Sequence, residues 1–159
     1  MKEKTFDGLT IRKLKTKDAA NFAKISNGLG MAQYLSYFRA KNVSEAENII
    51  VKNNRNGYAM YGLFVRRIGL VSVFYVSPPN SSGGAEISYF TGEDYFGNDY
   101  ASRGVQLLAQ TLSKNISYFT FAIKEENDAS LAVQSKLGSK EFSSSTRAYR
   151  HFLYNFNRL

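Results

Sequence analysis

The chain has 159 residues, no cysteine, one histidine and a formal net charge of +8 at pH 7. This composition excludes disulfides, cysteine-ligated zinc and thiol catalysis, and it argues against a histidine-based metal site or a serine-histidine triad. Hydrophobic residues make up 43% of the sequence, as in a globular domain, and no apolar run approaches the roughly 20 residues of a membrane span. The N-terminus MKEKTFDG lacks the apolar core of a signal peptide, so we expect a cytoplasmic protein without a membrane partner.

The excess positive charge favours polyanionic partners, such as nucleic acid, a phosphorylated cofactor or an acidic protein. The densest basic cluster is IRKLKTK (Ile11 to Lys17). Nucleic-acid binding requires a contiguous basic patch, whereas on an alternating strand Arg12 and the nearby lysines can form the solvated face. We favour the solvated face and keep nucleic-acid contact as the alternative.

The N-terminal part of the chain predicts one strand followed by helices. LTIRKL alternates as a strand does, and TKDAANFAKISN has helical spacing with Thr16 as its expected cap. The region from Gly28 to Lys41 is weakly patterned and predicts at most a short helix around Ala32 to Phe38. SEAENIIVKNN predicts a second clear helix from Ser44, with an acidic first turn that suits the helix dipole.

Three consecutive strands are predicted next, at Tyr58 to Val65, Ile68 to Val76 and Gly84 to Gly92. The stretch after them, GEDYFGNDYASRGVQLLAQTL, is polar and aromatic around Gly97 and then becomes an amphipathic helix. The first amides of such a helix have no internal partner and point at whatever lies before them. The strand, the small polar turn and the helix together predict a site for a phosphate.

The remainder of the chain predicts a strand, a helix and a final strand. SYFTFAI has the composition of a central strand, and NDASLAVQSKLG predicts a helix that ends at Gly138 and buries Leu131, Val133 and Leu137. TRAYRHFLYNF (Thr146 to Phe156) predicts the last strand. The order β-α-α-β-β-β-α-β-α-β predicts one α/β (α+β) domain over residues 1–159 with a mixed sheet.

Three segments of this second half, in this order and spacing, resemble the GNAT superfamily of acetyl-CoA-dependent N-acetyltransferases. AEISYF is similar to the fourth-strand phrase of its RimJ/RimL-like branch, YFGNDYAS to the phosphate turn, and NDASLAVQSKLG to the Asn-x-x-Ser helix. The resemblance implies acetyl transfer to a protein N-terminus or a small amine. It also implies a mixed, mostly antiparallel sheet with helices on both faces and a splay between the fourth and fifth strands, which should run parallel.

The resemblance also implies where acetyl-CoA binds. The pantetheine arm would lie in the splay and pair with the backbone of Ile87, Ser88 and Tyr89. The pyrophosphate would sit on amides at the helix start, and the next helix would contribute a side chain to the cofactor arm; these residues are Gly97, Asn98, Asp99, Tyr100, Ala101, Ser102 and Asn127. Asn127 fits equally well as a helix cap that holds no ligand.

Two residues depart from the pattern of the family. Asp99 stands where the phosphate turn has its second glycine, and its carboxylate adds like-charge repulsion of about 1 kcal/mol or more. Aspartate tolerates left-handed geometry there, Asp99 can cap the helix, and Arg103 one turn on could offset its charge. Ser139 stands where the family has phenylalanine. These departures bear on cofactor affinity and not on the fold.

Acetyl transfer needs a proton acceptor for the amine and a proton donor for the thiolate. Glu86 is the only acid in the three consecutive strands and is the candidate base, directly or through water; its alternative role is an outward polar side chain. Ser130 is the candidate proton donor, and an amide of Ile87 or Ser88 could polarise the thioester. With 11 tyrosines, Tyr89 and Tyr95 are weaker candidates. No metal is required.

Two other classes of function stay open at this level. One is an acyl-CoA-binding or protein-interaction domain of the same fold with little catalysis, which Asp99 motivates. The other is a basic nucleic-acid-binding module, in which the many aromatics would stack on bases. His151 is expected to be structural. The acceptor amine is expected to be bound by residues 28–41 and the last strands, and the protein is expected to be a monomer or a homodimer.

Overall fold

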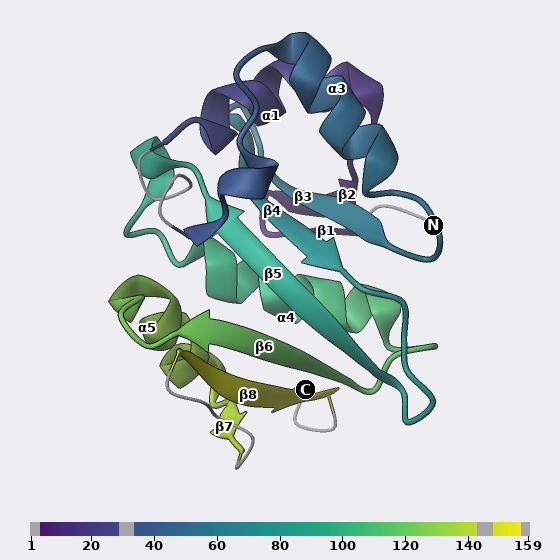
Figure 1. Cartoon of the computed structure of the whole chain (residues 1–159), viewed down its shortest axis with the longest axis vertical. Coiled ribbons are helices and arrows are strands. Elements are labelled where there is room, and N and C mark those ends of the chain that lie inside the picture. Colours follow the sequence, from purple (N-terminus) through teal and green to yellow (C-terminus); the bar gives the residue numbers. More distant parts are fainter. Residues whose placement is uncertain (1–3, 29–33, 143–147, 157–159) are drawn as a thin grey trace.

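The computed structural model describes residues 4–28, 34–142 and 148–156, which form a single open sheet flanked by helices (Figure 1). The strands are β1 (Lys4–Phe6), β2 (Leu9–Lys13), β3 (Ala59–Val65), β4 (Gly69–Val76), β5 (Gly84–Thr91), β6 (Tyr118–Lys124), β7 (Lys140–Glu141) and β8 (Tyr149–Asn155). The helices are α1 (Ala19–Ser26), α3 (Val43–Lys52), α4 (Tyr100–Leu112) and α5 (Asp128–Leu137), with single 3-10 turns η1 (Thr16–Asp18), η2 (Ser36–Phe38) and η3 (Glu93–Tyr95). The strand order is β1-β2-β3-β4-β5-β6-β8-β7.

The sheet is antiparallel except between β5 and β6, which run parallel because α4 crosses between them. These two strands pair at three positions, Gly84 with Tyr118, Ala85 with Phe119, and Glu86 with Thr120. Beyond Glu86, β5 continues beside β4 and β6 continues beside β8. The predicted parallel pair and its splay are therefore confirmed.

Helices cover both faces of the sheet, as the resemblance implies (Figure 1). On one face α1 and α3 bury Phe22 and Ile50 against strand residues such as Phe90. On the other, α4 buries Val105 and Leu108 in the larger of the two apolar clusters. The alternation of side chains along β5 divides its residues between these two faces.

Close packing on β4 fixes the position of α4 against the sheet. A Cβ added at Gly104 would lie 2.2 Å from Cζ of Phe74, whose side chain is fully buried. Only glycine lets the helix approach this ring so closely. The start of α4, and with it the predicted phosphate turn, is thereby fixed against the sheet.

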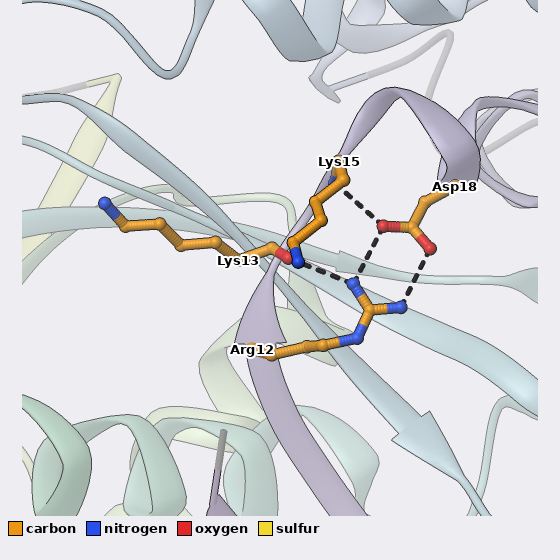
Figure 2. Close-up of polar contacts among 4 residues, drawn as sticks. All are labelled: Arg12, Lys13, Lys15 and Asp18. Carbon is orange, nitrogen blue, oxygen red and sulfur yellow. Dashed lines mark hydrogen bonds and ion pairs between the residues drawn. The ribbon is translucent and has the colours of Figure 1, made fainter. Parts of the chain in front are cut away.

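Arg12 holds the α1 region against the sheet (Figure 2). Its two terminal nitrogens donate to the two carboxylate oxygens of the buried Asp18 at 2.9 Å, and its guanidinium stacks 4.0 Å over the Phe64 ring. The Lys15 amide also donates to Asp18, at 2.8 Å. Burial acts to raise the pKa of Asp18, but the Arg12 hydrogen bonds, the Lys15 amide and the charges of Arg12 and Lys17 outweigh it and lower this pKa. The assignment of Arg12 to the solvated face is therefore wrong.

The predicted order of the longer elements is confirmed, with ends that shift by a few residues. Thr16 is not a helix cap but the first residue of η1, and the Asp18 carboxylate satisfies the Lys15 amide there. Helix α3 begins at Val43, with Asn42 as its cap. The strands β1 and β7 are short and were not predicted, and the predicted helix at 32–38 lies partly outside the described residues.

Candidate active site

The hydrogen bonds between β4 and β5 set the direction of the backbone groups along β5. The amide of Ser77 donates to the carbonyl of Glu86 at 3.0 Å, and the amide of Gly92 donates to the carbonyl of Val71 at 2.9 Å. Backbone groups alternate in direction along an antiparallel strand. The even-numbered residues from 86 to 92 therefore bond β4, and the odd-numbered ones face away from it.

Ile87 and Tyr89 consequently turn their backbone N–H and C=O groups towards the gap, where β6 no longer pairs with β5. Among the residues that the structure describes, this edge is unpaired, and it is suited to an extended polar chain that adds to it as a strand would. The backbone groups of Ser88 point to β4 and not to the gap. Ser88 therefore contributes to the site through its side chain.

Two cavities, each of about 460 Å³, flank this gap. The first lies between the start of α4 and α5, and the second lies beside Glu86 on β5 and residues of β6 and β8. Tyr89, Asn127 and Ser130 line both cavities, so the cavities meet at these side chains. Each predicted site residue lines at least one of them: Glu86, Ile87, Ser88, Tyr89, Gly97, Asn98, Asp99, Tyr100, Ala101, Ser102, Asn127 and Ser130.

The first cavity opens onto the turn that precedes α4. Gly97 has φ 83°, and Asp99 has φ 59° and ψ 21°, so both residues have a left-handed backbone conformation. Glycine adopts this conformation without strain, and it would therefore suit the position of Asp99. The first bond of the helix runs from the Arg103 amide to the Asp99 carbonyl, at 3.0 Å. The amides of residues 100–102 therefore have no intrahelical partner, and the Asp99 side chain does not cap them.

The charge of Asp99 is paired by a residue that the sequence analysis did not single out. The Lys136 ammonium, on α5, donates to the Asp99 carboxylate, and both side chains are more than half exposed. Arg103, which was expected to offset this charge, pairs with Asp7 at 3.4 Å instead. An exposed ion pair contributes about 0–1 kcal/mol, so Lys136 can readily exchange the carboxylate for a phosphate.

Ser130 lies at the junction of the two cavities. The Asn127 side chain accepts from the Ser130 amide at 3.2 Å, so Asn127 is the cap of α5 and also part of both cavity walls. The hydroxyl oxygens of Ser130 and Tyr89 are 2.6 Å apart. Burial raises the pKa of Tyr89, against the hydrogen bonds of Ser130 and Gln134, so the phenol stays protonated at neutral pH.

Glu86 is exposed and points to the opposite face of the sheet from Tyr89, into the second cavity. Tyr37 lies beside it: burial raises the pKa of Tyr37, its hydrogen bond with Ser88 acts against this, and the charge of Glu86 adds to it. Lys124 and His151 complete a polar wall. A carboxylate thus faces a cavity that an amine can enter from solvent.

Several residues of the site were not predicted, among them Lys136, Gln134 and Tyr34. Lys136 and the fully buried Gln134 both lie on α5, where the sequence predicts an apolar side of Leu131, Val133 and Leu137. Of those three only Leu137 is buried, while Leu131 and Val133 are partly exposed. Tyr34, which lines both cavities, belongs to a region with little pattern. The position of Gln134 in the sequence gives a weak indication that it is buried, because it lies on the same helical face as Leu137.

The residues present fit acetyl-CoA: a free strand edge for an extended amide chain, uncapped helix amides and Lys136 for phosphate, and an adjoining cavity. Within the described residues, no cluster of three or more histidine, aspartate or glutamate side chains could hold a metal ion. Over the same residues, no helix has the length and apolar character needed to cross a membrane.

A splayed parallel pair, a turn with uncapped helix amides and two cavities meeting at a hydroxyl are the arrangement that an acyl-CoA-dependent transferase requires. Residues 8–140 match the family model described as the acetyltransferase (GNAT) domain. The chain belongs to this family of acetyltransferases. No curated protein sequence matches the chain.

Solved structures of the same fold include several acetyltransferases. A GNAT-family acetyltransferase from Bacillus anthracis superposes with a TM-score of 0.80 at 16% identity, over 98% of this chain and 99% of that one. A Salmonella typhimurium acetyl transferase that modifies the N-terminal serine of a 50S ribosomal subunit protein gives 0.80 at 17% identity, over 94% and 96%. The Vibrio cholerae spermidine N-acetyltransferase, in complex with CoA and spermine, gives 0.78 at 14% identity, over 96% and 98%.

Proposed function

We propose that this protein transfers an acetyl group from acetyl-CoA directly to a primary amine, either a protein N-terminus or a small amine. The observation that carries this proposal is the unpaired edge of β5 at Ile87 and Tyr89, between two cavities that meet at Ser130. Acetyl-CoA supplies the acetyl group as a thioester, which the amine attacks at the carbonyl carbon with loss of the thiolate.

The gap between β5 and β6 and the first cavity beside it would hold the cofactor. The backbone of Ile87 and Tyr89 would pair with the pantetheine arm, and the amides from Gly97 to Ser102 would bind the pyrophosphate. Asn127 would border the arm near its reactive end. Lys136 would leave Asp99 and add a positive charge beside the phosphates.

The second cavity would hold the acceptor amine. Glu86 would accept a proton from the ammonium, directly or through water, so that a neutral amine faces the gap. Ser130 would donate its hydroxyl proton towards the leaving sulfur and recover a proton from water. Both groups line the second cavity, and Ser130 also lines the first, so one bound amine can lie between them.

We propose a cytoplasmic enzyme made of one domain over residues 1–159, monomeric or homodimeric, with neither a membrane nor a nucleic-acid partner. The amines accepted by the fold neighbours, a ribosomal-protein N-terminus and a polyamine, define the two substrate classes to try first.

Mass spectrometry of candidate amines incubated with the protein and acetyl-CoA tests this proposal. We expect one acetyl group on the primary amine of short N-terminal peptides or of a polyamine, and we expect acetyl-CoA to raise the melting temperature. Ser130→Ala should lower turnover less than Glu86→Gln does, because water can replace a hydroxyl donor. Binding of acetyl-CoA with no transfer to any amine would contradict the proposal and indicate a binding domain.

A further inference from the structure

Helix α5 buries a glutamine beside Leu137, the other buried residue of this helix. Gln134 has no exposed surface and is among the largest fully buried side chains of the described residues. A buried amide is costly unless its polar atoms find partners. The Oε1 atom of Gln134 has no hydrogen-bond partner in the described structure, so apolar packing alone does not account for glutamine at this position.

The hydrogen bond that Gln134 does make runs to the active site. Its Nε2 donates to the Tyr89 hydroxyl oxygen at 3.3 Å, and that oxygen lies 2.6 Å from the Ser130 hydroxyl oxygen. The Tyr89 ring is held near the rings of Phe74 and Phe121, with centroids 6.3 Å and 5.9 Å away. The phenol oxygen is thus fixed between the amide and the serine.

The number of hydrogens in this chain limits the directions that its hydrogen bonds can take. A phenol has one hydrogen to donate and lone pairs with which to accept. Because the Gln134 amide donates to the Tyr89 oxygen, the Tyr89 hydrogen is left to point at Ser130, whose hydroxyl oxygen at 2.6 Å is a nearer acceptor than its carbonyl oxygen at 3.3 Å. Once Ser130 accepts that hydrogen, its own hydrogen is available at the junction of the two cavities.

We propose that Gln134 is a positioning residue that sets the direction of the chain Gln134 to Tyr89 to Ser130, so that Ser130 presents its hydrogen to the leaving sulfur. Gln134 lines neither cavity and touches neither substrate. This role rests on the proposed acetyl transfer. In this role the Tyr89 hydroxyl orients Ser130, in addition to the pairing of the Tyr89 backbone with the cofactor.

The test compares Gln134→Met, which keeps an unbranched chain without the amide, with Tyr89→Phe, which keeps the ring without the hydroxyl. We expect each to lower kcat about tenfold and to leave the Kd for acetyl-CoA within about twofold of the wild type, as expected for backbone pairing. The double variant should be no slower than Tyr89→Phe alone, because Gln134 acts only through that hydroxyl. Gln110→Met, at an exposed position of α4, is the matched control and should keep wild-type kcat.

A second readout does not depend on activity. In protein labelled with 13C at tyrosine Cζ, Gln134→Met should shift the Tyr89 resonance and Gln110→Met should not. An unchanged Tyr89 resonance, a wild-type kcat for Tyr89→Phe, or additive losses in the double variant would overturn the proposal. So would failure to fold of both Gln134→Met and Gln134→Leu, because Gln134 would then be structural. If the wild type acetylates no amine, the acetyl-transfer proposal fails, and the resonance still decides whether Gln134 bonds Tyr89.

Discussion

The two cavities differ in what forms them. The first includes backbone groups in its wall, at Tyr89 on the edge of β5 and at the uncapped amides at the start of α4, with side chains such as Tyr100 around them. The polar wall of the second is made of side chains, including Glu86, Lys124 and His151. A backbone site depends on strand order and helix position, so it tolerates unusual side chains such as Asp99. A side-chain site has no such tolerance.

The largest expected effect lies in the second cavity. Glu86→Gln removes the proposed base, which typically costs about 100- to 10,000-fold in turnover, and it should leave the affinity for acetyl-CoA nearly unchanged. The loss should shrink as the pH rises, because more of the amine is then already deprotonated. Steady-state kinetics against pH, with calorimetry for affinity, measures both.

The matched control is Glu47→Gln, an exposed acid on α3 that lines neither cavity, and it should keep wild-type turnover. Wild-type turnover of Glu86→Gln at neutral pH would remove Glu86 from the mechanism. The site would then act by placing a neutral amine.

A methyl group at Gly104 tests whether the position of α4 builds the first cavity. Gly104→Ala must displace the helix from the Phe74 ring, and overpacking of this kind costs about 1–3 kcal/mol of unfolding free energy. We expect weaker acetyl-CoA binding as well, because the amides of the turn move with the helix. Denaturant unfolding and calorimetry measure the two effects, with Gln110→Ala on the exposed face of the same helix as control. Unaltered stability would show that α4 has room at this ring.

Asp99 tests how far the first cavity tolerates a side chain. Asp99→Gly removes a carboxylate beside the phosphates, frees Lys136 and suits the left-handed backbone, so acetyl-CoA should bind up to about tenfold more tightly, or about 1.4 kcal/mol. Asp99→Asn, which also tolerates this conformation, should give most of the gain if charge is the cause. Weaker binding of both variants in calorimetry would mean that Asp99 has a constructive role.

The smallest effect is expected outside both cavities, at Asp18. Its folded pKa lies below the ordinary value, so its contribution to stability is present above about pH 5 and is lost as the pH falls through the folded pKa. Asp18→Asn should therefore be less stable than the wild type near neutral pH and should approach it in acid, with acetyl-CoA affinity unchanged. Thermal unfolding from pH 7 to pH 3 measures this; a stability difference that grows in acid would contradict it.

Sequence reasoning reached the features that depend on local pattern. The alternation of β5, the turn at Gly97 and the helix that stops at Gly138 follow from spacing and glycine, and the splay follows from the family resemblance. It missed what depends on tertiary pairing. Lys136 meets Asp99 across 37 positions of the chain, and Gln134 meets Tyr89 across 45; no local pattern reports either contact. Arg12 was misassigned for the same reason, since its carboxylate partner comes from the next element.

Amide hydrogen exchange by NMR, with and without acetyl-CoA, tests most directly the claim that the cofactor pairs with the backbone edge of β5. We expect the amides of Ile87 and Tyr89, which face the gap, to become protected when acetyl-CoA binds. The amides of Ser88 and Phe90, which face β4, should already be protected and change little. Binding of acetyl-CoA that leaves the exchange of Ile87 and Tyr89 unaltered would contradict the account.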